Sequence, residues 1–347
     1  MSKRGLAIIT VIGLLVFGCS SHKQEVQKEY TVLGNLEILP KISLLDFELK
    51  GDVKSISEYE YEAILKFGEY EKIEPCSSII EHLFNAKGMI FETITYVSNY
   101  SSDHSMVLKK KSKYLYNINN LLEKIDVYGM SGELVEREVY LYDPNNKCIE
   151  KAQYNGDGSL IEQRLINYDK KGRIMTYERY YRGKLSYSTK YNYDKRGRLI
   201  ESTSKDSHKS TSYKYDKLNN VMEEVEYNSK GWILYKTFYK YRGKEETEMI
   251  ELDPIDLMIT RTNYVKSGKV LTFFEKGDES VESRTYIYNN KHELIEDKYA
   301  DGGSQIFRYD DKSNWNYNLL VTTKYNVAGE IVGTDAWIKV REINYWN

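Results

Sequence analysis

A nine-residue phrase near the middle of the chain, YNYDKRGRL, has near copies on both sides of it. With its second tyrosine as position 0, the phrase has an aromatic residue at 0, Asp or Asn at +1, Gly or Asn at +4 and an apolar residue at +6. Chance does not produce many such copies at fixed offsets, so the chain is built from a repeated structural unit. Thirteen copies, several lacking one feature, begin at Phe84, Tyr116, Tyr128, Tyr142, Tyr154, Tyr168, Tyr193, Tyr215, Tyr227, Tyr264, Tyr288, Tyr309 and Tyr325.

The spacing of the phrase predicts a three-residue hairpin loop, in which a type I turn ends on a residue with left-handed backbone conformation. Asp194 caps this turn, and Gly197 supplies the positive φ, which Asn adopts best among the other residues. Tyr193 then pairs across the hairpin with Leu199, while Asn192 and Ile200 take the other face. The predicted structural turn residues are Asp143, Asn146, Asp169, Gly172, Asp194, Gly197, Asp216 and Asn219.

From Tyr116 to Tyr241 the turns recur at steps of 12 to 14 residues, apart from one gap of 22, when the shorter Arg-Gly turns at Tyr181 and Tyr241 are included. Each step is one strand plus half a turn at each end. The chain also has 33 Tyr, 22 Gly and only 4 Pro, a composition that favours strands and tight turns. We therefore predict an all-β fold, a long antiparallel meander of repeated hairpins with about twenty strands. Because open sheets of more than about ten strands curl or split, we expect an open spiral or trough, with two stacked sheets as the alternative.

The amino terminus has the pattern of a secretory signal. Lys3 and Arg4 precede Gly5 to Phe17, an apolar stretch too short to span a bilayer as a helix. The stretch ends at Val16-Phe17-Gly18-Cys19, which resembles a bacterial lipobox and implies that Cys19 is lipidated. An ordinary cleaved signal with a chance Cys, or an apolar segment that is not secreted, are the alternatives.

This pattern divides the chain into three predicted segments. Residues 1–18 are a lipoprotein signal peptide, residues 19–46 the lipidated Cys and a tether, and residues 47–347 the hairpin-repeat domain. Ser20 after the Cys, by resemblance to Gram-negative lipoproteins, favours the outer membrane. The sequence does not indicate which side of that membrane the protein faces.

The Tyr-Asp phrases, above all Tyr191 to Leu199, resemble the YD repeats of the Rhs and teneurin families over about residues 80–335. The chain is also similar to small lipoproteins built only from such repeats. A rival resemblance, to MORN-type repeats, fits Tyr154 to Leu160. The large YD-repeat proteins wind their sheet into a hollow shell, which in Rhs proteins holds a toxic domain. We do not expect that role here, because too few strands are predicted to close a large shell.

No catalytic or metal-binding pattern stands out, and we expect no enzyme activity, cofactor or metal. The five His are scattered, and no Cys pair has the spacing of a zinc site. Cys76 and Cys148 can form a disulfide in the envelope, but Cys148 occupies the apolar +6 position, which favours a buried thiol. Lys plus Arg number 50 and Asp plus Glu number 52, so we expect no nucleic-acid partner.

Aromatic side chains are the remaining candidates for function, because Tyr and Trp can stack on sugars or anchor a protein interface. The candidates are Tyr191, Trp232 and Trp337, although most Tyr are expected to form the core of a thin sheet. The sequence thus predicts a non-catalytic envelope lipoprotein, anchored in the membrane by its lipid, that binds an unknown protein or glycan. An envelope glycan-active enzyme and an immunity or antitoxin-like repeat protein remain as alternatives.

Overall fold

A computed structural model describes residues 39–99, 105–243, 245–253, 258–267, 270–276, 281–291, 293–299, 301–326 and 330–346. These residues form one 23-stranded sheet in which all pairings are antiparallel, and no helix occurs among them. The first strands are β1 (Val53–Lys66), β2 (Glu69–Lys72), β3 (Ser78–Phe84), β4 (Ile90–Ser98), β5 (Met106–Tyr116), β6 (Leu122–Tyr128), β7 (Leu134–Tyr142), β8 (Cys148–Asn155), β9 (Leu160–Tyr168), β10 (Ile174–Tyr181), β11 (Lys184–Tyr193) and β12 (Leu199–Ser204). The others are β13 (Lys209–Tyr215), β14 (Val221–Tyr227), β15 (Ile233–Arg242), β16 (Glu245–Asp253), β17 (Met258–Ser267), β18 (Val270–Lys276), β19 (Val281–Tyr288), β20 (Leu294–Lys298), β21 (Ser304–Tyr309), β22 (Trp315–Tyr325) and β23 (Ile331–Tyr345).

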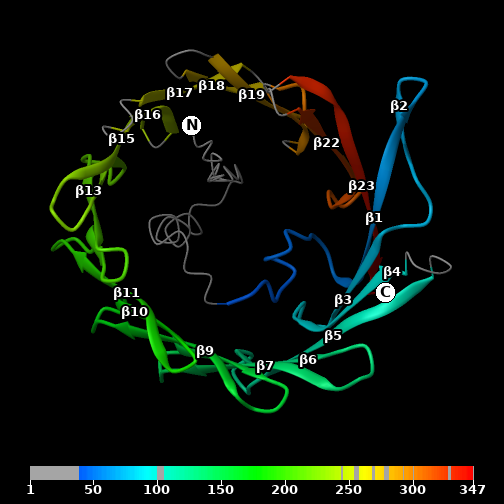
Figure 1. Cartoon of the computed structure of the whole chain (residues 1–347), viewed down its shortest axis with the longest axis horizontal. Coiled ribbons are helices and arrows are strands. Elements are labelled where there is room, and N and C mark those ends of the chain that lie inside the picture. Colours follow the sequence, from blue (N-terminus) through cyan, green and yellow to red (C-terminus); the bar gives the residue numbers. More distant parts are fainter. Residues whose placement is uncertain are drawn as a thin grey trace. The chain divides into compact units, whose positions relative to one another are not determined.

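The predicted meander is confirmed. From β3 to β23 each strand pairs with the next one along the chain, as Figure 1 shows by the steady change of colour from one strand to its neighbour. The sheet is single, so the alternative of two stacked sheets is not adopted by the described residues.

The first strand has a place that the hairpin repeats did not predict. Residues Ser55–Glu60 of β1 pair with β3, and the same stretch pairs along its other side with β23. β1 therefore lies between β3 and β23, and the two ends of the meander meet there (Figure 1). Reading consecutive hairpins could not reveal this contact, because it joins residues nearly 300 positions apart.

The turn geometry follows the template. The amide of Gly197 donates to the carbonyl of Asp194 (3.0 Å), the amide of Asp194 donates to the carbonyl of Arg198 (2.9 Å), and Tyr193 pairs with Leu199. One detail was not predicted. A β-bulge follows the turn, so Asn192 pairs with Glu201 and Ile200 is an additional residue in its strand. The same register shift recurs after other template copies, so the bulge belongs to the repeat.

The segment before β1 is part of the fold. The amide of Leu44 donates to the carbonyl of Gly88 (2.9 Å), and the amide of Ile90 donates to the carbonyl of Ile42 (2.8 Å). Ile42, Leu44 and Phe47 also pack on a buried cluster that contains Phe84 and Ile90. Residues 42–46, which the sequence analysis placed in the tether, thus contact the β3–β4 hairpin.

The predicted signal peptide, Cys19 and the start of the tether lie outside the described residues. Among the residues that the structure does describe, no helix is long and apolar enough to cross a membrane.

Candidate functional site

The turns of the meander lie along two edges. The turns that join β3 to β4, β5 to β6 and every second pair up to β21 and β22 lie along one edge, because successive strands run in opposite directions. We call this the tyrosine edge. The turns that join β6 to β7, β8 to β9 and the pairs between lie along the opposite edge.

Tyrosine hydroxyls connect neighbouring turns of the tyrosine edge. Six template Tyr on this edge donate a hydrogen bond to the carbonyl of the +6 residue in the preceding turn, so that a side chain serves a backbone acceptor there. Burial raises the pKa of Tyr215 and of Tyr309 to about 12, so these phenols remain donors at neutral pH. The bonds are Tyr116 to Ile90 (2.6 Å), Tyr142 to Leu122 (2.7 Å), Tyr168 to Cys148 (2.8 Å), Tyr193 to Ile174 (2.9 Å), Tyr215 to Leu199 (2.7 Å) and Tyr309 to Leu294 (2.7 Å).

Basic side chains at position +5 also join neighbouring turns, because they lie over the ring of the template Tyr in the next turn of this edge. The guanidinium of Arg173 lies 4.5 Å from the ring centre of Tyr193, and that of Arg198 lies 4.8 Å from the ring centre of Tyr215. Such cation–π contacts stabilise by about 0.5–1 kcal/mol at exposed sites. The sequence analysis did not include position +5, although Lys147, Arg173 and Arg198 in successive copies were a signal that could have identified it.

The structure places all eight predicted turn residues in turns of the tyrosine edge. The carboxylate of Asp169 accepts hydrogen bonds from the amides of Lys171 (2.8 Å) and Arg173 (2.9 Å). The hydrogen bond from the amide of Arg173 has the largest effect on the pKa of Asp169; desolvation opposes it and the Arg173 guanidinium adds to it, so this pKa is lowered to about 2. Asp143, Asp194 and Asp216 accept the equivalent pairs of amides, and Asn146, Gly172, Gly197 and Asn219 have φ of 65°, 78°, 89° and 66°.

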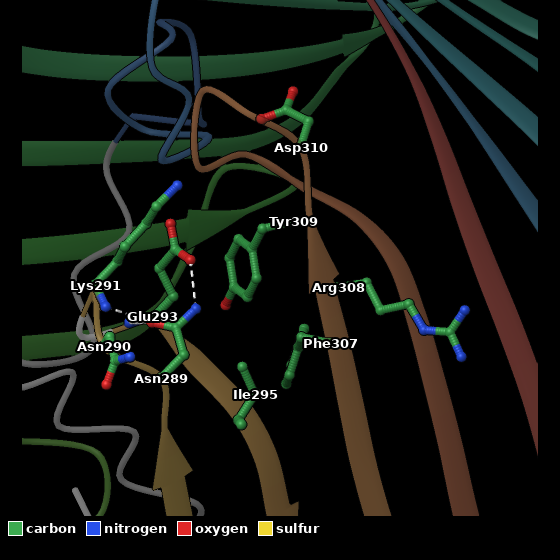
Figure 2. A pocket seen from close by; sticks show the side chains of 9 residues that line it. All are labelled: Asn289, Asn290, Lys291, Glu293, Ile295, Phe307, Arg308, Tyr309 and Asp310. Atoms are coloured by element: carbon green, nitrogen blue, oxygen red, sulfur yellow. Dashed lines mark hydrogen bonds between the residues drawn. The ribbon is translucent and has the colours of Figure 1, made fainter.

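A pocket of about 420 Å³ lies between the β19–β20 and β21–β22 turns (Figure 2). Both of its carboxylates bond to the chain itself, although Oε1 of Glu293 is buried without a hydrogen-bond partner. Asn289 donates to Glu293 (2.6 Å), as drawn in Figure 2, while Asp310 accepts from the amide of Asn314 (2.9 Å) and from the hydroxyl of Tyr345 (2.6 Å). These carboxylates therefore shape the turns and do not converge on a common point. No group of three His, Cys, Asp or Glu that could hold a metal occurs in the part of the chain that the structure describes.

The three candidate aromatic residues lie on different parts of the sheet and are not brought together. Tyr191, on β11, is half-buried, and burial followed by the neighbouring phenols of Tyr187 and Tyr193 raises its pKa. Trp337, on β23, is also partly buried between β1 and β22. Both side chains therefore pack within the sheet. Trp232 differs, because 66% of it is exposed.

The β14–β15 turn on the opposite edge presents Trp232. The side chain of Asn228 accepts hydrogen bonds from the amides of Lys230 (2.9 Å) and Trp232 (3.1 Å), which fixes the loop. The ammonium of Lys230 lies 5.2 Å from the indole ring centre. Tyr235, three residues farther along β15, is 52% exposed. This hairpin therefore presents two large aromatic side chains to solvent.

The two described cysteines are unpaired. Cys76 and Cys148 are both buried free thiols, and burial raises the pKa of Cys148 to about 11. Cys148 packs where other copies have Leu, Ile or Val, and its thiol is protonated and unreactive at neutral pH.

Comparisons with known proteins define the chain only by its fold. No protein-family profile and no curated protein matches the sequence. A porin-like protein from Bacteroides uniformis has a TM-score of 0.33 and 7% identity, over 85% of this chain and 98% of that one. A Photorhabdus luminescens Tc holotoxin pore has a TM-score of 0.25 and 9% identity, over 79% of this chain and 20% of that one. Neither likeness carries an argument about function. By its fold, the chain is an all-β protein of repeated antiparallel hairpins.

Proposed function

We propose that this chain is a non-catalytic repeat scaffold, held in the bacterial cell envelope by a lipid on Cys19, that binds a protein or glycan partner. We place it at the outer membrane, and we propose that its hairpins are a short form of the YD repeat. The observation that carries the binding role is the exposed Trp232 on the β14–β15 hairpin.

An exposed Trp is a candidate anchor for a binding partner. An indole is a large apolar surface, and Trp is enriched among the residues that dominate binding interfaces. Its flat ring can also stack on a sugar, while its N–H donates a hydrogen bond. The hydrogen bond from the amide of Trp232 to the side chain of Asn228 fixes the backbone of the turn, so little ordering of the loop is required when a partner binds.

The non-catalytic part of the proposal is supported by the pocket in Figure 2. General acid–base chemistry requires a carboxylate or imidazole directed at a substrate. Glu293 and Asp310 are directed instead at Asn289, Tyr345 and backbone amides. His82, a partly buried imidazole, bonds to Thr93 (3.1 Å) and packs on Phe47.

The test compares the wild-type chain with Trp232→Ala in glycan arrays and in pull-downs from envelope extracts. Trp346→Ala is the matched control, because Trp346 is 43% exposed but lies at the tyrosine edge. We expect Trp232→Ala to lose the captured glycan or protein while the control retains it. If both variants bind like wild type, or if purified chain instead cleaves an array glycan, the proposal is wrong.

A further inference from the structure

Basic side chains are concentrated on three successive turns of the tyrosine edge. Lys170, Lys171, Lys195, Arg196 and Lys217 lie at the turn tips and are exposed. None of them forms an ion pair with another residue in the described part of the chain. The β9–β10 and β11–β12 turns each carry two of these tip cations and the β13–β14 turn carries one, whereas each opposite-edge turn between β8 and β15 has at most one Lys or Arg between its strands. The excess of basic tips therefore lies on two neighbouring turns of the tyrosine edge, although the whole chain has a net charge of −2.

The acidic residues of these turns do not neutralise the tips. The carboxylates of Asp169 and Asp194 accept backbone amides within their own turns and pair with Arg173 and Arg198 at position +5. Asp216 accepts two amides of its own turn and the side-chain amide of Asn220. The cations at the tips thus face solvent without a nearby carboxylate directed toward them. An anionic partner is the complement of such a surface.

The same edge also exposes aliphatic side chains at its tips. Ile118, in the β5–β6 turn, is 97% exposed, and Leu218, in the β13–β14 turn, is 54% exposed. Exposed apolar tips alone do not distinguish the edges, because Met130 on the opposite edge is 66% exposed. The tyrosine edge differs in the number of its basic tips, and basic tips with apolar side chains among them suit the interface of an anionic bilayer.

The chain enters its fold at this edge. Leu44 bonds to Gly88 in the β3–β4 turn, and the backbone of Lys50 bonds on both its amide and its carbonyl to the side chain of Asn314 in the β21–β22 turn. The first described residues therefore lie at the tyrosine edge.

We propose that the tyrosine edge docks on a membrane surface of anionic phospholipid, with the basic tips on the headgroups and Ile118 and Leu218 in the interface. This inference rests on the proposed lipid anchor and adds an orientation to it, with the opposite edge and Trp232 directed away from the bilayer. Docking by charge weakens with salt, because the screening length falls from about 10 Å at 0.1 M to about 3 Å at 1 M.

The test places an environment-sensitive fluorophore on Ile118→Cys in the full lipidated chain. Cys76 and Cys148 are buried, so the label goes to the new thiol. Met130→Cys on the opposite edge is the matched control. The chains are reconstituted into vesicles of phosphatidylcholine, with or without phosphatidylglycerol carrying brominated acyl chains. We expect a blue shift and loss of fluorescence at position 118 only with phosphatidylglycerol, reversal of both at high salt, and no change at position 130.

Reversing the charge of the tips tests whether they cause the fluorescence shift at position 118. Lys195→Glu with Arg196→Glu should abolish the shift at position 118, and Arg182→Glu with Lys205→Glu, on the opposite edge, should preserve it. A label at position 118 that stays in water, or equal shifts at both positions, would overturn the inference. Flotation of the vesicles separates this failure from that of the anchor. A chain that floats with its label in water refutes only the docking, whereas a chain that does not float refutes the anchor as well.

Discussion

Tyrosine at the first position of the repeat acts through both its ring and its hydroxyl. The ring of Tyr193 pairs with Leu199 and lies under Arg173, and its hydroxyl reaches the carbonyl of Ile174 in the preceding turn. The high Tyr content therefore has a structural explanation at the tyrosine edge, since Phe could supply the ring but not the bond between turns. For an exposed aromatic side chain such as Trp232, we propose that binding explains its presence better than packing does.

Tyr193→Phe should destabilise the fold. The substitution removes one hydrogen bond and leaves the carbonyl of Ile174 without its donor, a loss of about 1 kcal/mol in the free energy of unfolding. Chemical denaturation monitored by circular dichroism measures it. Tyr235→Phe, an exposed phenol on the opposite edge, is the control and should change stability little. Equal stability of the two variants would show that the hydroxyl bonds contribute nothing.

The turn carboxylates predict an acid-sensitive fold. Asp169 has its pKa lowered from 3.8 to about 2 in the folded chain, so its contribution to stability is complete above pH 3.8 and is lost as the pH falls toward 2. Asp169→Asn, which cannot ionise, should lower stability at neutral pH and flatten its pH dependence across this window. Thermal unfolding of both chains between pH 5 and pH 2 measures this pH dependence. A variant with the wild-type pH profile would contradict the assignment.

Sequence reasoning was strongest for residues that act within one turn. Asp194 and Gly197 are set by the local backbone, so their spacing alone predicts the loop. The bond from Tyr193 to Ile174 and the contact with Arg173 join different turns, and their existence depends on how far apart neighbouring hairpins lie. The exposure of Trp232 compared with Trp337 also depends on packing, which one sequence does not provide.

At the scale of elements, β1 and the segment before it join the two ends of the meander. Asn314 is nearly fully buried, and its side chain accepts from the amide of Lys50 (2.7 Å) and donates to the carbonyl of Lys50 (2.9 Å) and to Tyr345 (2.8 Å). One side chain thus connects the segment before β1, the β21–β22 turn and the end of β23.

Asn314→Ala should loosen this junction. Each buried group left without a partner costs about 1–3 kcal/mol, and we expect the loss to be local to β1 and its preceding segment. Hydrogen exchange resolved by peptide should show faster exchange over residues 42–60, while β7 to β12 stay protected. Asn290→Ala, an exposed residue of the neighbouring tyrosine-edge turn, should leave exchange unchanged. Uniform loss of protection would mean that Asn314 does not act at the junction alone.

The meander itself followed from the sequence because each hairpin is encoded by its own turn. The neighbours of β1 could not be predicted in the same way. Its pairing with β23 depends on the rotation of each hairpin relative to the next, added up along the whole sheet. The bulge that follows turns such as that of Tyr193 was also missed, since Leu199 and Ile200 are both apolar and either could pair with the template strand.

At the scale of the whole molecule, the account assigns different roles to the two edges of one sheet. The tyrosine edge is cross-connected, basic at its tips and joined to the segment before β1. The opposite edge exposes Trp232 and Tyr235. We propose that a lipid on Cys19 holds this sheet near a membrane and that its aromatic edge binds a partner there, which is the central claim.

The most direct test of that claim is the location of the wild-type chain and of Cys19→Ala after membrane fractionation, with mass spectrometry of the mature amino terminus. We predict that the wild-type chain begins at an acylated Cys19 and sediments with outer membranes, and that Cys19→Ala is released from them. A variant that stays in the membrane fraction, or a wild-type chain whose Cys19 carries no acyl chain, would contradict the account.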